Sequence, residues 1–131
     1  MKQNNDNNNG LTVERPIVRL MVEYKGKVAF INWLIDTGAD LTLLSIDTAK
    51  QLGMDFTGKT VFIRGIVGGD TFYAKQVNMW ADGICPFTAT VYISPNNHSN
   101  LLGRDVLFKQ FAVYMDKDRI VLEQLHHCSM R

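Results

Sequence analysis

The sequence has little cysteine, little net charge and no long apolar run, and each shortage excludes a class of protein. Its 2 cysteines, Cys85 and Cys128, lack the paired spacing and neighbouring histidines of a zinc site, so we expect reduced thiols and no metal. The 14 Lys and Arg side chains nearly balance 13 Asp and Glu, which disfavours a nucleic-acid partner. The longest apolar run, residues 28–35, is interrupted by Asn32 and is far shorter than the ~20 residues of a membrane helix. We therefore expect a soluble protein without a membrane partner.

Length and composition predict one domain behind a polar lead-in. A chain of 131 residues with 46% hydrophobic side chains can bury one core but is short for two domains. Residues 1–10 are rich in Asn and poor in apolar side chains, which predicts a flexible N-terminal segment. We place the folded domain at residues 11–125 and a short C-terminal tail at residues 126–131.

Alternating apolar and polar residues, β-branched runs and intervening glycines predict many short strands. The expected strands are residues 17–24, 28–35, 41–44, 60–67, 71–80, 87–93, 111–115 and 120–125. Short helices are expected at residues 46–52, with Ser45 as N-cap, and at residues 104–109, after Gly103. The predicted fold class is all-β, a closed barrel or sandwich-like sheet with one or two short helices.

An apolar strand that runs directly into Asp36-Thr37-Gly38 is the candidate for chemistry. A carboxylate at the edge of an apolar layer loses hydration, and such groups concentrate at functional sites. Gly38 permits the backbone to approach a ligand closely. Taken alone, the segment fits an ordinary Asx-type turn at a strand end equally well.

A second apolar run supports the functional interpretation, because it ends on Gly103-Arg104-Asp105. Together with Arg15-Pro16 and a glycine-rich stretch at residues 62–69, this pattern resembles the retroviral and retrotransposon aspartic proteases, or retropepsins. In that family an Asp-Thr-Gly-Ala-Asp block lies roughly sixty residues before an apolar-apolar-Gly-Arg block, with a glycine-rich flap hairpin between them. The resemblance covers residues 15–116 and implies the retropepsin fold.

The resemblance also implies an aspartic endopeptidase that acts on extended polypeptides without a cofactor or metal. Asp36 would be the catalytic carboxylate, Thr37 would brace the catalytic pair, and Gly38 would offer its backbone to the substrate. Such an enzyme needs two carboxylates that share a proton, and Asp-Thr-Gly occurs once in this sequence. The implied enzyme is therefore a two-fold homodimer with one Asp36 from each copy.

Further roles follow from the resemblance residue by residue. Asp40 would meet Arg104 within the subunit and the partner's Arg15, so that both arginines support structure or dimerisation. The residues expected to contact substrate are Ala39, Asp40, Leu34, Leu43, Ile63, Gly65, Ile66 and Leu101. The apolar members of this set fit an ordinary core position equally well.

The sequence departs from the family pattern in the flap and at the C-terminus. Arg64 and Val67 interrupt the usual flap glycines, and residues 116–131 extend beyond compact retroviral enzymes. Because terminal strands often build the interface in this family, an extra strand at residues 120–125 would alter the dimer contacts.

Three functions are compatible with these features: viral or retroelement polyprotein maturation, regulatory cleavage by a cellular or bacterial peptidase, and non-catalytic peptide binding or dimerisation. The expected location is the virion or host cytoplasm for a viral enzyme, and the cytoplasm otherwise.

Overall fold

The computed structural model describes residues 3–6, 10–13, 16–64, 68–117 and 119–126. The elements in chain order are β1 (Gln3–Asp6), β2 (Gly10–Val13), β3 (Ile17–Tyr24), β4 (Lys27–Ile35), β5 (Leu43–Leu44), α1 (Ile46–Gln51), β6 (Thr60–Arg64), β7 (Gly69–Ala81), β8 (Ile84–Ile93), β9 (Leu101–Leu102), α2 (Arg104–Gln110), β10 (Phe111–Asp116) and β11 (Arg119–Gln124). The predicted all-β class with two short helices is confirmed. Neither helix of the described segments has the length and apolar character needed to cross a membrane.

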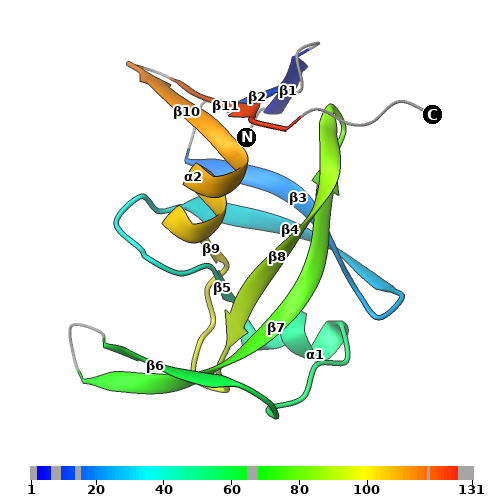
Figure 1. The fold of residues 1–131 in the computed structure, drawn as a ribbon, viewed down its shortest axis with the longest axis vertical. Coiled ribbons are helices and arrows are strands. Elements are labelled where there is room, and N and C mark those ends of the chain that lie inside the picture. Colours follow the sequence, from blue (N-terminus) through cyan, green and yellow to red (C-terminus); the bar gives the residue numbers. More distant parts are fainter. Residues whose placement is uncertain (1–2, 7–9, 14–15, 65–67, 118, 127–131) are drawn as a thin grey trace.

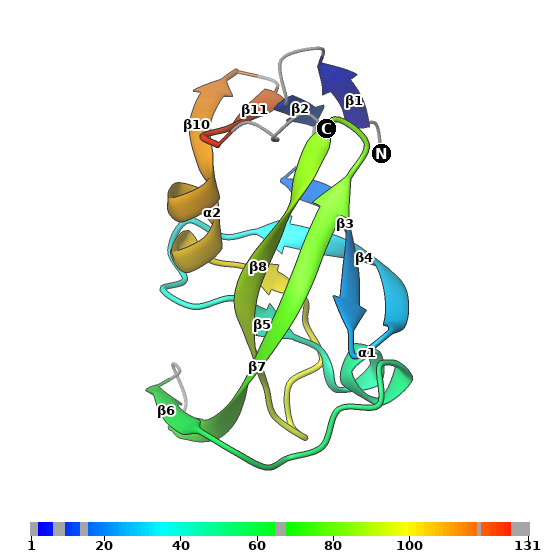
Figure 2. The same cartoon turned by 45° about the vertical axis from the view of Figure 1, so that its right-hand side comes forward.

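The strands form two sheets at different levels of the molecule. The seven-stranded sheet has the order β3-β4-β9-β5-β8-β7-β6, and an additional pairing between β3 and β7 curls it back on itself. The four-stranded sheet has the order β1-β2-β11-β10 and joins both ends of the chain. It lies at the opposite end of the molecule from the β6–β7 hairpin (Figures 1 and 2).

The β3–β4 hairpin shows how local sequence produces this architecture. Buried and exposed side chains alternate along β4, so one face of the strand points into the core. Lys25 and Gly26 both have positive φ, 48° and 87°, as the tight turns that match strand twist require. The hairpin predicted at residues 17–35 is confirmed with its turn.

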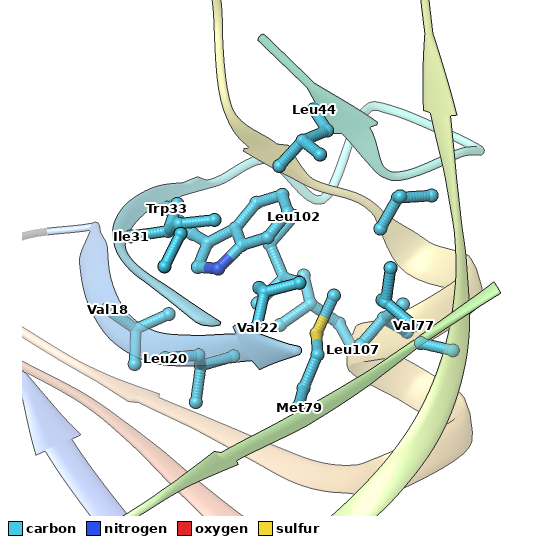
Figure 3. Close-up of a cluster of buried hydrophobic side chains, with 14 of the residues drawn as sticks. Val18, Leu20, Val22, Ile31, Trp33, Leu44, Val77, Met79, Leu102 and Leu107 are labelled. Carbon is cyan, nitrogen blue, oxygen red and sulfur yellow. The ribbon is translucent and has the colours of Figure 1, made fainter. Parts of the chain in front are cut away.

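One hydrophobic core joins the two sheets. Trp33 is fully buried and lies among Val22, Ile31 and Leu102 (Figure 3). The same cluster contains four side chains of the terminal strands, namely Leu11, Val13, Phe111 and Leu122. The four-stranded sheet is therefore part of the domain and not an appended tail.

Two expectations are corrected by the structure. Gln3–Asp6, within the segment expected to be a flexible lead-in, forms strand β1 and pairs with β2. Backbone hydrogen bonds in a sheet need no apolar side chains, so composition did not reveal this strand. Cys85 is disulfide-bonded, which makes the expectation of a reduced thiol wrong for this residue. Cys128 lies outside the described residues.

Candidate active site

Asp36 stands directly after β4, in a turn that fixes its carboxylate. Its backbone N–H donates to the carbonyl of Leu102 at 3.0 Å, and its own carbonyl accepts from the N–H of Ala39 at 3.1 Å. The N–H of Gly38 donates to Asp36 Oδ1 at 3.0 Å. Asp36 is half-buried, whereas Thr37 and Gly38 are exposed. The turn is of the Asx type, and within the described residues nothing hydrogen-bonds to Asp36 Oδ2, so this oxygen is available to a ligand.

The second motif packs directly against the first. Strand β9 lies between β4 and β5, so that Leu102 is in register with Ile35. The N–H of Arg104 donates to the carbonyl of Ala39 at 2.8 Å. A Cβ at Gly103 would lie 2.4 Å from the carbonyl oxygen of Leu41, a distance no side chain tolerates. Glycine is required here because two backbones meet, and this contact brings the two predicted motifs together.

The predicted ion pair between Asp40 and Arg104 is confirmed, with Arg104 Nη2 donating to Asp40 Oδ1. The two side chains are 78% and 48% exposed, so the pair contributes at most ~1 kcal/mol to the stability of one subunit. Arg15, the other arginine assigned to this carboxylate, lies outside the described residues. The pair orients the first turn of α2 against the Asp36 loop.

Sequence reasoning missed a buried polar link beneath the site. Thr42 is fully buried; its hydroxyl donates to Asp105 Oδ1 at 2.7 Å and accepts from the N–H of Gly103 at 3.0 Å. The carbonyl of Thr42 accepts from the N–H of Tyr92 at 3.0 Å. Burial, and then the charge of Asp105, raise the pKa of the Tyr92 hydroxyl. The signal in the sequence for this buried link was Thr42, the one polar residue in the apolar run 41–44.

Three of the predicted pocket residues form a continuous floor beside Asp36. Leu101 is in register with Leu34 on one side and with Leu43 on the other. Leu34 is 43% exposed and the other two are half-buried, so all three present apolar surface. Ala39 is half-buried in the adjoining turn.

Ile63 belongs to a different part of the molecule, the β6–β7 hairpin, where it pairs with Asp70. The tip of this hairpin, with the predicted contacts Gly65 and Ile66 and the departure at Val67, lies outside the described residues. The hairpin and the loop between β4 and β5 open on the same side of the molecule in both views (Figures 1 and 2). That the hairpin acts as a flap over Asp36 stays a prediction.

The β6–β7 hairpin is tied to the domain at two places. Near its tip the Ser94 hydroxyl donates to Asp70 Oδ2, and this hydrogen bond is the main cause of the lowered pKa of the Asp70 carboxyl. Further along β7, Lys75 Nζ lies 2.8 Å from Asp55 Oδ1, and the Lys75 side chain is only 9% exposed. Sequence reasoning found neither anchor, because both join residues about twenty positions apart.

The described segments contain no group of three or more His, Cys, Asp or Glu side chains placed to hold a metal ion. The group for chemistry that the geometry identifies is the Asp36 carboxylate, which the Gly38 N–H holds by one oxygen. The expectation that no cofactor is needed stays a prediction.

The comparisons with known proteins agree with this geometry. The family model described as retroviral aspartyl protease matches residues 12–115. A retropepsin-like aspartic protease from Rickettsia conorii has a TM-score of 0.64 at 18% identity, with 93% of this chain and 94% of that chain covered. The EIAV protease, solved with the inhibitor HBY-793, has a TM-score of 0.57 at 22% identity, with 72% and 86% covered. These two likenesses show the fold, and a comparison with curated proteins finds no match.

Proposed function

Because this chain belongs to the retroviral aspartyl protease family and is therefore an aspartic endopeptidase, we propose that it works as a homodimer with one shared catalytic centre. Each copy would contribute one Asp36. The proposal rests on the geometry of the Asp36 turn. The Asp36 carboxylate is half-buried, one of its oxygens accepts from the Gly38 N–H, and the other has no hydrogen-bond partner among the described residues. The sequence contains no second Asp-Thr-Gly that would complete the pair within one chain.

Two such carboxylates can act as the general base and the general acid of peptide hydrolysis. Like charges in close contact resist double ionisation, so the pair holds one shared proton, as in aspartic proteases generally. The ionised Asp36 takes a proton from water as the water oxygen attacks the peptide carbonyl. The protonated Asp36 of the other copy donates to the carbonyl oxygen, and a proton then passes to the leaving nitrogen as the C–N bond breaks.

We propose an extended polypeptide as substrate, bound between the β6–β7 hairpin and the floor of Leu34, Leu43 and Leu101. Backbone hydrogen bonds to an added strand would hold the peptide, and side-chain pockets would select its residues. The exposed apolar surface of this floor favours apolar residues on both sides of the scissile bond.

Polyprotein maturation in a virus or retroelement is our first choice of biological role. Regulatory cleavage in a cell is the second candidate. It is favoured by the greater extent of the fold shared with the Rickettsia conorii protein, 93% of this chain against 72% for the EIAV protease. A gene located beside capsid or reverse-transcriptase coding sequence would decide for the first role.

The decisive experiment compares Asp36→Asn with Asp47→Asn, a matched loss of one exposed aspartate in the first turn of α1. Asp36→Asn should abolish cleavage of a peptide library while circular dichroism and sedimentation show the fold and dimer retained. Asp47→Asn should cleave at the wild-type rate. Undiminished turnover by Asp36→Asn would exclude the mechanism. Peptide binding without turnover by the wild type would favour a non-catalytic binding domain.

The dependence of the cleavage rate on pH, measured on the same proteins, is a second test. The rate should fall as pH rises above neutral, because the pair loses its shared proton. A chelator should leave the rate unchanged.

A further inference from the structure

The β6–β7 hairpin leaves the rest of the seven-stranded sheet at Tyr73. This residue is opposite Ile93, in the last register pair of β7 with β8. From there toward the tip, residues 69–72 of β7 pair only with β6 among the described strands. The hairpin therefore extends past the end of β8 (Figures 1 and 2). A two-stranded hairpin alone is marginally stable in water, so the direction of this one depends on contacts outside its own backbone ladder.

One face of the hairpin points inward and is apolar except for a single carboxylate. Val61 and Ile63 on β6 are half-buried, and Phe72 on β7 is buried. Asp70 lies on the same face and is opposite Ile63, one of the residues expected to contact substrate. A carboxylate beside apolar side chains is costly unless it is hydrogen-bonded. The partners of Asp70 therefore decide what it does there.

Both oxygens of Asp70 are engaged. Its Oδ1 accepts from the N–H of Thr71 at 2.8 Å, and its Oδ2 accepts from the Ser94 hydroxyl and from Asn96 Nδ2, the latter at 3.3 Å. The Ser94 hydroxyl also accepts from the N–H of Asn96 at 3.2 Å, so that two hydrogen bonds run in series into the carboxylate. Ser94 has 0% exposure, so this hydroxyl is shielded from solvent. We call the hydrogen bonds of Asp70 with Ser94 and Asn96 the Asp70 anchor.

The segment between β8 and β9, which holds the other end of the Asp70 anchor, is itself braced against the site. Asn97 Nδ2 donates to the carbonyl of Leu44 at 3.0 Å. The carbonyl of Asn100 accepts from the N–H of Leu34 at 2.9 Å, two residues before Asp36. The Asp70 anchor therefore connects the hairpin to a segment whose position is fixed relative to the floor and to the catalytic turn.

We propose that Asp70 is a positioning residue for peptide cleavage. Through Ser94 and Asn96 it holds the β6–β7 hairpin at a fixed distance from the floor of Leu34, Leu43 and Leu101, so that the inner face with Ile63 is preorganised for an extended peptide. The inference rests on the proposed function, because it assumes that the peptide binds between hairpin and floor. Asp70 acts through Ser94 and does not contact the reacting atoms.

Two single variants and their double mutant test the Asp70 anchor kinetically. Ser94→Ala removes the hydroxyl donor, and Asp70→Asn puts an amide NH₂ group where a carboxylate oxygen now accepts. The hairpin contacts the peptide in the ground state and the transition state alike, so each variant should raise KM about tenfold and leave kcat within about twofold of wild type. The double mutant should show no more than the larger single effect, because both changes break one network.

Thr88→Ala is the matched control. It removes a hydroxyl that donates to Asn78 at 3.1 Å, at a place where β7 and β8 are already paired by their backbones, so KM should keep the wild-type value. A KM that rises in Asp70→Asn but not in Ser94→Ala would show that Asp70 contacts the substrate itself, and this would overturn the inference. Additive effects in the double mutant, or an equal rise of KM in Thr88→Ala, would overturn it as well.

Residue-resolved hydrogen exchange on the unliganded protein tests the Asp70 anchor without any cleavage. Ser94→Ala should raise the exchange rates of residues 69–72 about tenfold and leave residues 76–79, in the β7–β8 ladder, unchanged. Equal changes in both segments would indicate a general loss of stability, and no change in either would show that the anchor does not hold the hairpin. Both results would overturn the inference. If Ser94→Ala does not fold, Asp70→Asn takes its place.

Failure of the proposed function would look different. A wild type that cleaves no peptide would contradict the proposed function, whereas the exchange rates of residues 69–72 would still decide whether Asp70 holds the hairpin. A wild type that cleaves, with the same KM and the same exchange rates in Ser94→Ala, would overturn only the positioning role of Asp70.

Discussion

The two sheets of this protein differ in how closely their backbones meet. In the seven-stranded sheet, the two-residue strands β5 and β9 are held by crossing contacts around Thr42 and Gly103, which leave no room for an added methyl group. In the four-stranded sheet the strands pair regularly, and the outer strand β10, which has no second partner among the described strands, carries the exposed side chains of Tyr114 and Met115. The first arrangement suits a site that must hold Asp36 in one position. The second suits association with another copy.

The largest expected effect comes from comparing two glycine substitutions, one at a close backbone contact and one at a positive φ. Gly103→Ala would place Cβ 2.4 Å from the Leu41 oxygen and 3.0 Å from the Ala39 oxygen, both backbone atoms. Gly26→Ala meets no atom within 4 Å and suffers only from its φ of 87°. We expect Gly103→Ala to lower the free energy of unfolding by ~3 kcal/mol or more and to abolish cleavage. Gly26→Ala should cost ~1–2 kcal/mol with activity retained.

Urea unfolding and peptide cleavage, measured on both glycine variants, check this expectation. Equal losses of stability would show that the junction of the two motifs is less tightly packed than the structure indicates.

The next effect compares one fully buried leucine from each sheet. Leu102→Ala and Leu122→Ala should each lower the free energy of unfolding by ~2–5 kcal/mol, since both side chains have 0% exposure. Their effects on activity should differ. The carbonyl of Leu102 holds the N–H of Asp36, so kcat should fall at every protein concentration. Leu122 is opposite Val113 in the β10–β11 pair, so Leu122→Ala should lose activity mainly at low protein concentration.

Cleavage rates of the two leucine variants across a dilution series distinguish these cases. If Leu122→Ala lost cleavage activity equally at all protein concentrations, the proposal that the two sheets have different roles would be wrong.

The smallest effect concerns the anchor of the β6–β7 hairpin. The hydrogen bond from Lys75, and then the one from Thr57, lower the pKa of the Asp55 carboxyl from 3.8 to about 2. Stability from this group is therefore present above pH 3.8 and is lost as pH falls toward 2. Asp55→Asn should flatten the decline of Tm over this range, but solvent screening at the 70% exposed carboxylate keeps the change modest.

Thermal unfolding of Asp55→Asn beside Asp47→Asn, in buffers from pH 2 to 5, measures that contribution. Parallel Tm curves for the two variants would show that the Lys75–Asp55 pair contributes nothing to acid stability.

Local sequence determined much of this protein. Lys25-Gly26 determined the first turn, and Ser45 caps α1 as predicted, accepting from the N–H of Thr48 at 3.2 Å. Asp36-Thr37-Gly38 and Gly103-Arg104 identified the site. The turn and the helix cap depend on residues close together in the chain, so they could be predicted without knowledge of distant contacts. The two site motifs could be predicted because their residue types and order resemble a known family, although the contact of Gly103 with Leu41 is itself long-range.

Only the tertiary structure decided how these parts are joined. The Thr42–Asp105 hydrogen bond, the Ser94–Asp70 anchor and the intrachain pairing of β2 with β11 connect residues far apart in sequence. The polar strand β1 and the disulfide at Cys85 gave no local signal either. Backbone pairing and buried hydrogen bonds depend on which segments meet in space. The four-stranded sheet, with β1 and β10 as its outer strands, is therefore a property of the fold.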